Sequence, residues 1–193
     1  VPGEIVESVL TDPTGGGDFS FIGAQGGSIL TLCDVDDDAA GGVTIDGGAA
    51  GVALIIVGLV DLDESTLTNV TSVTLEDGAT LRIQMSDADA IGAGNFLIAD
   101  GDEADLELVG LGEEPFALAN YDSDITVAVV SIVDQPIVTL NAATDLTGIT
   151  SLQVPEGVTL NLTAEQFQQL TGEGAITGIS NTTNFTVNVT DWT

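Results

Sequence analysis

Apolar residues recur along this chain in short runs, and several runs alternate apolar with polar positions. In 158–162 and again in 185–189 every second residue is apolar. A period of two places successive side chains on opposite faces of an extended strand. We therefore predict strands at Ile29–Leu32, Val43–Ile45, Val52–Val60, Val73–Leu75, Thr80–Ile83, Phe96–Ile98, Leu106–Leu108, Ile125–Val133, Ile137–Leu140, Thr150–Val154, Val158–Leu162 and Phe185–Val189.

Helical periodicity is weak, with one candidate helix at Thr163–Leu170. Thr163 stands where a helix cap is expected, and Gln166 follows three residues later. That spacing predicts a capping box, in which each residue bonds the backbone of the other.

The first 28 residues are less regular than the rest. Glycine clusters at 15–17 and 26–27 flank a short apolar run, Phe19–Ile22. We expect an N-terminal arm over 1–28 that packs on its own domain or adds as a strand to a neighbouring copy, and we favour the first.

An internal repeat relates the middle of the chain to its C-terminal part. Residues 67–83, LTNVTSVTLEDGATLRI, match residues 146–162, LTGITSLQVPEGVTLNL, without a gap, and seven of the 17 positions are identical. The similarity continues more loosely: 85–90 answers 164–169, and 106–108 answers 187–189. We predict two β units, 29–111 and 112–193, forming one continuous domain.

Two all-β architectures fit this pattern. One is a β-solenoid-like stack of short strands with a thin aliphatic core. The other is a pair of Ig-like β-sandwiches. Short strands, abundant Gly and an aromatic fraction of only 4% favour the solenoid.

Charge restricts the possible partners. The chain has 31 acidic residues, one basic residue (Arg82) and a net charge of −30. Binding to nucleic acid or to an anionic membrane surface requires Lys and Arg, so both are excluded. The longest apolar run, Val52–Val60, is interrupted by Gly58 and is predicted to be a buried strand, so no membrane insertion is expected. Bound cations, high salt or a positive partner must offset the self-repulsion.

Acidic clusters between the predicted strands are candidate calcium sites, because calcium takes several oxygen ligands from tight loops. The predicted ligands are Asp34, Asp36 and Asp38 in one cluster and Asp100, Asp102 and Asp105 in another. The first is not an EF-hand, since Ala39 stands at the glycine position and Ile45 at the twelfth. A solvated acidic turn is the alternative for each cluster, and for those at 61–64 and 122–124.

Five N-x-[ST] sequons occur, at Asn69, Asn161, Asn181, Asn184 and Asn188. They fit an extracellular surface, or rows of Asn and Thr hydrogen-bonded along a sheet face. Cys33 is the only cysteine, so no intramolecular disulfide forms, and we expect a small buried hydrophobe. The chain begins at Val1 rather than Met, which indicates a mature product or a fragment.

Catalysis has few candidate groups. Without His or Lys, neither a Ser-His nor a Cys-His arrangement can be built. Paired carboxylates could hydrolyse glycosides, and this is the remaining enzymatic alternative. We expect no enzyme, and we expect Arg82 to pair with neighbouring carboxylates.

The unit L-T-x-[VI]-T-S-[VL]-x-[LV]-x-[DE]-G-[AV]-T-L, followed by LTAEQF at 162–167, resembles repeats of large acidic bacterial surface-layer proteins and surface adhesins. The resemblance implies an extracellular, cell-surface structural protein, often calcium-dependent, that assembles into a filament, sheath or layer. We expect a homo-oligomer or polymer joined through the arm and the strand Phe185–Val189. The alternative is an adhesin module that recognises carbohydrate or a cell surface.

Overall fold

The computed structural model describes residues 6–11, 19–24, 26–35, 43–98, 102–112, 115–132, 135–149, 152–170, 176–178 and 184–190. Strands dominate these residues, and the all-β prediction is confirmed. The chain forms two compact units. The first unit comprises 1–107 and 121–126, and the second comprises 108–120 and 127–193.

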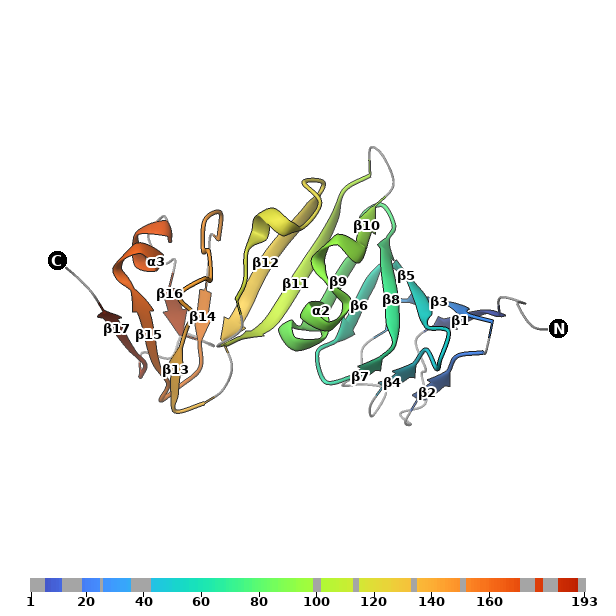
Figure 1. Ribbon diagram of the computed structural model, residues 1–193, viewed down its shortest axis with the longest axis horizontal. Coiled ribbons are helices and arrows are strands. Elements are labelled where there is room, and N and C mark those ends of the chain that lie inside the picture. The colour runs from blue at the N-terminus through green and yellow to red at the C-terminus, as the bar shows by residue number, and fades with distance from the viewer. Residues whose placement is uncertain are drawn as a thin grey trace. The chain divides into compact units, whose positions relative to one another are not determined.

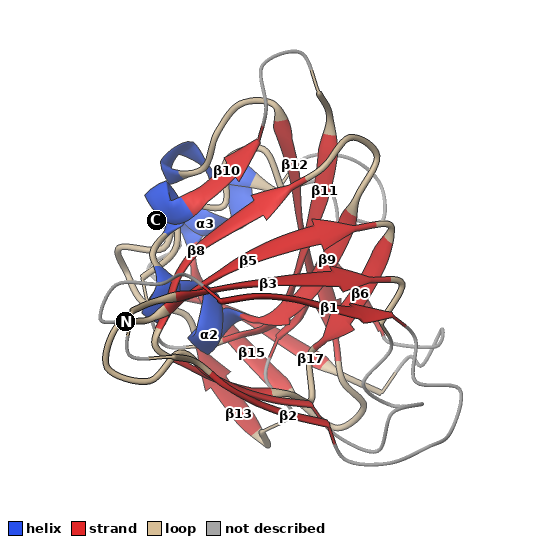
Figure 2. Ribbon diagram, turned by 90° about the vertical axis from the view of Figure 1, so that its right-hand side faces the viewer, coloured by secondary structure: helices blue, strands red, loops and turns tan. Residues whose placement is uncertain are grey.

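Three groups of strands build the first unit (Figure 1). The largest is a five-stranded sheet in the order β1–β3–β5–β8–β10, which Figure 2 shows side by side. The bounds of its strands are β1 Val6–Thr11, β3 Ser28–Cys33, β5 Val52–Val57, β8 Val70–Leu75 and β10 Phe96–Ile98. A second sheet has the order β2–β4–β7, with β2 Phe19–Ile22, β4 Val43–Asp46 and β7 Thr66–Thr68. The third group is β6 Leu59–Leu62, β9 Thr80–Gln84 and β11 Ala104–Leu111.

Parallel returns of the chain generate these sheets. Val6 lies opposite Ser28, and Ser28 lies opposite Val52, so these two returns take 22 and 24 residues. Phe19 lies opposite Val43 with the same spacing. Each time the chain returns in this way, it adds a strand to each of the two sheets.

Aliphatic rows fill the interior of the first unit. The register aligns Leu30 with Leu54 and Leu54 with Val73, and each of these side chains is no more than 1% exposed. The next inward row, Leu32, Ile56 and Leu75, is completely buried. This is the aliphatic core that the low aromatic content predicted.

The second unit repeats the arrangement. The neighbouring strands β12, β14 and β16 belong to a six-stranded sheet, and β13–β15–β17 form a three-stranded sheet. Their bounds are β12 Ile125–Ile132, β13 Ile137–Thr139, β14 Leu152–Val154, β15 Thr159–Thr163, β16 Ile176–Gly178 and β17 Thr186–Thr190. Val138, Leu160 and Leu162 are buried beneath the second sheet.

Eleven strand pairs have a defined register, and all eleven are parallel. Six of them lie within the β1–β3–β5–β8–β10 and β2–β4–β7 sheets, one joins β6 to β9, and four lie in the second unit. Stacked parallel coils are what a β-solenoid requires. Ig-like sandwiches are built from antiparallel pairs, so these eleven pairs do not fit that alternative.

The predicted repeat is visible in the backbone hydrogen bonds. Gly78 N donates to Glu103 O at 2.8 Å, and 79 positions later Gly157 N donates to Asn184 O at 2.6 Å. Asp105 N donates to Ala79 O at 2.8 Å, and Thr186 N donates to Val158 O at 3.0 Å. Both turns place the glycine at positive φ, 70° for Gly78 and 79° for Gly157, where other residues are strained. The repeated sequence therefore builds the same turn and the same strand pairing twice.

One short helix follows the second strand of each repeat: α2 Met85–Ile91 in the first and α3 Ala164–Gln169 in the second. The capping box at α3 is confirmed, since Thr163 Oγ1 accepts from Gln166 N and Gln166 Oε1 accepts from Thr163 N. Two 3-10 turns, η1 Ala93–Asn95 and η2 Leu118–Asn120, complete the helical elements of the described residues. None of the helices in this part of the chain could cross a bilayer.

The strand predictions need two corrections. Val52–Val60 is not one strand, because Gly58 has φ 69° and turns the chain from β5 into β6. The N-terminal arm is more regular than predicted: β1 pairs with β3 and β2 pairs with β4. Within the chain, the described strands of the arm thus pair with β3 and β4.

Gln166 generates a stability prediction. It is 2% exposed, and its Nε2 donates to Asn141 O at 2.7 Å and to Thr144 O at 3.1 Å. Gln166→Ala should lower the free energy of unfolding by about 1–3 kcal/mol, because two carbonyls and the Thr163 N–H lose their partner. Urea denaturation checks this against exposed Gln168→Ala, expected to change stability by less than about 0.5 kcal/mol. Equal losses in the two variants would contradict the role of Gln166.

Candidate functional site

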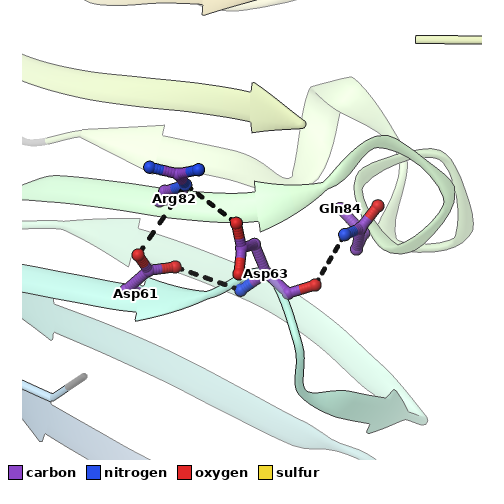
Figure 3. Close-up of polar contacts among 4 residues, drawn as sticks. All are labelled: Asp61, Asp63, Arg82 and Gln84. Carbon is purple, nitrogen blue, oxygen red and sulfur yellow. Dashed lines mark hydrogen bonds and ion pairs between the residues drawn. The ribbon is translucent and has the colours of Figure 1, made fainter. Parts of the chain in front are cut away.

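The only basic residue lies in the first unit between two carboxylates (Figure 3). Arg82 Nε lies 2.9 Å from Asp63 Oδ2 and 3.7 Å from Asp61 Oδ2. Gln84 Nε2 donates to Asp63 O at 2.6 Å, and Asp63 N donates to Asp61 Oδ1 at 3.2 Å. The expected pairing of Arg82 with carboxylates is confirmed, and its side chain holds the β6 turn against β9.

Asp34, the first of the predicted calcium ligands, stabilises a turn of the backbone. Its φ is 50°, and its Oδ1 accepts from Leu59 N at 3.1 Å. A Cβ on Gly58 would collide with the Asp34 carboxylate, so the glycine leaves space for this contact. The other ligands of that cluster, Asp36 and Asp38, lie outside the described residues.

The second predicted cluster is only partly described. Asp102 is half-buried and the Asp105 side chain is exposed, while Asp100 lies outside the described residues. Nearby, Asp77 Oδ1 accepts from Glu103 N at 3.4 Å. Within the described ranges, no three His, Cys, Asp or Glu side chains are grouped as metal ligands would be. The calcium assignment therefore stays a prediction.

Several acidic residues build turns, the role that was predicted as the alternative for the clusters at 61–64 and 122–124. Asp46, Asp61, Asp122 and Asp145 each accept, through Oδ1, the N–H of the residue two positions later, at 2.8–3.2 Å. This is the Asx turn, in which a side chain replaces a backbone carbonyl. The D-x-[DGT] spacing in the sequence is the signal that could have identified it.

Hydrogen bonds also set the charge state of two of these turns. Donation from Asn69 and Gly48 lowers the pKa of Asp46, and donation from Thr147 lowers the pKa of Asp145. By contrast, burial raises the pKa of Asp87 on α2. Bonds to an ionised carboxylate favour that form, so the Asp46 and Asp145 turns keep their negative charge to lower pH than a free aspartate.

Two of the sequon asparagines form the predicted side-chain ladder. Asn188 Nδ2 donates to Asn161 Oδ1, and Asn161 Nδ2 donates to Thr139 Oγ1, both at 3.0 Å. The ladder crosses β17, β15 and β13 on their outward face. Asn69 donates to Asp46 and Asn184 donates to Glu156, whereas Asn181 lies outside the described residues.

A small polar pocket of about 260 Å³ lies beside α3 in the second unit. Asp145 and Glu165 are among its lining residues. A glycosidase needs one carboxylic acid with a raised pKa, but hydrogen bonds lower the pKa of Asp145. Asp145 therefore does not fit the acid of such a pair, and the glycosidase alternative stays a prediction.

Comparison with protein-family models, with curated proteins and with solved structures finds no match for this chain.

The Arg82 cluster should be sensitive to salt. Arg82→Asn, which introduces the residue of the equivalent repeat position, should destabilise the protein by about 1 kcal/mol or less at low ionic strength. The difference should fade near 1 M NaCl, where the screening length falls to about 3 Å. Urea denaturation at both salt concentrations tests this, with Arg82→Lys as the control that keeps the charge. A loss that does not depend on salt would show that Arg82 acts through packing.

Tyr121 should titrate unusually late. Burial, with a smaller contribution from Asp89, raises its pKa to about 12, and its ring packs 5.6 Å from Phe96. In the unfolded chain its pKa is about 10, so ionisation favours unfolding and stability should fall as pH rises from about 10 to about 12. Phenolate absorbance reports the only Tyr of the chain, and the absence of Lys keeps this pH range free of amine titration. Tyr121→Phe should lose this pH dependence; an unchanged slope would contradict the assignment.

Proposed function

We propose that this chain is a structural module of an extracellular assembly, a β-solenoid that self-associates into a filament, sheath or surface layer. The observation that carries the proposal is the exposed edge of β17. The proposal includes cations bound at acidic turns, which reduce repulsion between copies.

β17 lies at the edge of its sheet, beside β15 (Figure 1). Val187 and Val189 lie next to Leu160 and Leu162 in the register. The two leucines are no more than 2% exposed, whereas the two valines are only half-buried. The row of inward side chains thus ends incompletely covered.

The backbone of β17 also has free bonding capacity. Thr186 N donates to Val158 O. In a parallel pair every second residue of a strand bonds to the same neighbouring strand, so Thr186, Asn188 and Thr190 face β15. The N–H and C=O groups of Val187 and Val189 therefore point to the other edge, where no strand of the described residues pairs with β17. Such an edge is a template for a further strand.

β1 and β2 are edge strands of their own sheets in the first unit. Pairing of β17 in one copy with a different edge in the next is a heterologous contact. Contacts of this type produce open filaments when the rotation between copies does not close a ring.

Copies with a net charge of −30 repel one another, and Arg82 is already paired with Asp61 and Asp63. Divalent cations or high salt would lower that repulsion at the interface. Calcium suits carboxylate-rich loops. The proposed cation role rests on this charge balance.

A second candidate is an adhesin module that binds carbohydrate. The Asn188–Asn161–Thr139 ladder favours it, because the ladder presents amides and a hydroxyl on an outward sheet face. A glycan array with the isolated monomer tests this function, and specific binding without polymer formation would support it over self-assembly.

Light scattering and negative-stain microscopy test the main proposal, with calcium and then with EGTA, at two salt concentrations. We expect polymers that dissociate when calcium is removed at low salt. Polymers that persist under every condition would refute the cation role, and a compact monomer throughout would refute self-assembly.

The edge of β17 can be tested with one residue. Val187→Pro removes an edge-facing N–H without removing a bond to β15, so it should raise the concentration needed for polymerisation at least about tenfold while the monomer stays folded. Val187→Ala is the matched control, because it shortens the side chain but keeps the N–H. Equal polymerisation of the two variants would show that assembly does not use this edge.

A further inference from the structure

The five-stranded sheet of the first unit has a nearly uncharged outer face. Its outward positions alternate with the buried rows, and the register sets them side by side. The central row crosses all five strands: Val9, Thr31, Ile55, Thr74 and Leu97. The flanking rows are Glu7, Ile29, Ala53 and Ser72 on one side and Thr11, Cys33 and Val57 on the other.

Apolar side chains on this face are open to solvent. Val9 is 69% exposed, Leu97 47% and Val57 37%. They lie on β1, β10 and β5, so exposure extends from one edge of the sheet to the other (Figure 2). The face is therefore a continuous surface rather than isolated exposed residues.

Charge is confined to the border of this face. Glu7 lies in a flanking row, and Glu76 follows the end of β8. The outward positions of β6 and β9 in the same unit are different, since they include Asp61 and Arg82. Despite 31 acidic residues in the chain, this sheet face is thus almost free of carboxylates.

The area of the face limits how strongly a partner can bind to it. Five strands about 4.8 Å apart, with about five residues each at about 3.3 Å, span roughly 24 by 17 Å, or about 400 Å². A patch of that size commonly marks an interaction site. It is about half of the roughly 800 Å² per partner in a standard interface, so one such contact is weak and becomes effective when repeated.

We propose that this face packs against the same face of a second copy and joins filaments side by side. The inference rests on the proposed function, because a filament presents the face many times. Face-to-face packing at about 10 Å places the uncharged rows together and leaves the carboxylates at the rim.

Salt gives this lateral contact a distinct signature. Repulsion between the two acidic copies is screened as the Debye length falls from about 10 Å at 0.1 M salt to about 3 Å at 1 M, so lateral association should strengthen. Contacts bridged by cations should weaken over the same range, because their attraction is screened too.

The test uses the Val187→Pro chain, in which end-to-end growth is blocked. Analytical ultracentrifugation should show dimers whose dissociation constant falls with added NaCl. Thr74→Asp, which places a carboxylate in the central row, should raise that constant at least about tenfold. Thr66→Asp is the matched control, since Thr66 is an exposed residue of β7 in the other sheet and should leave the constant unchanged.

Cys33 provides a second readout that does not depend on the proline variant. It is the only cysteine, and it is half-buried in a flanking row of the face rather than buried in the core as predicted. Its alkylation rate in the wild-type chain should fall at least about threefold as concentration rises through the association range. Thr74→Asp should abolish that protection, and Thr66→Asp should keep it.

The outcomes separate the two proposals. Wild-type polymers with a monomeric Val187→Pro chain and concentration-independent alkylation would overturn the lateral contact and leave self-assembly intact. A wild type that forms only dimers sensitive to Thr74→Asp would support the face and refute the filament. Slow alkylation of a monomer at every concentration would show that a segment of the same chain covers the face, and would overturn the inference.

Discussion

Stacked rows of aliphatic side chains hold each unit together. The parallel register places Leu30, Leu54 and Val73 over one another, and the row beside it contains Leu32, Ile56 and Leu75. Burial of apolar area is the main favourable term in folding, and here it comes from many branched side chains of similar size. Because a shift of one residue would turn a whole row outward, these rows also fix the strand register.

Turns carry the acidic residues that this core cannot hold. Burying a charge without a partner is costly, and the chain has one cation to offer. Asp46, Asp122 and Asp145 instead accept backbone N–H groups within their own turns. Part of the acidity of the chain is therefore structural, because several carboxylates stabilise the turns between strands. The other carboxylates on the exterior repel those of a second copy, and any assembly must overcome this repulsion.

Period-two alternation made the strands predictable, and the 79-residue offset made the paired turns at Gly78 and Gly157 predictable. The break at Gly58 was missed, because apolar residues continue on both sides of the glycine and the whole run was interpreted as one strand. The contact of Asp34 was missed for a related reason: its partner, Leu59 N, lies 25 positions away in the sequence and is brought close only in the folded chain. Short segments such as β7 were missed because three residues give too little alternation to recognise.

The two repeats show which positions leave room for function. Inward positions keep their character, with Leu81 and Ile83 answered by Leu160 and Leu162, all buried. The outward position between them differs, because Arg82 binds two carboxylates whereas Asn161 joins the Asn and Thr ladder. The same backbone arrangement therefore carries a charged surface in the first repeat and a neutral surface in the second repeat. Since the core constrains every second residue, selection on outward residues can change what a sheet face contacts without changing the coil beneath it.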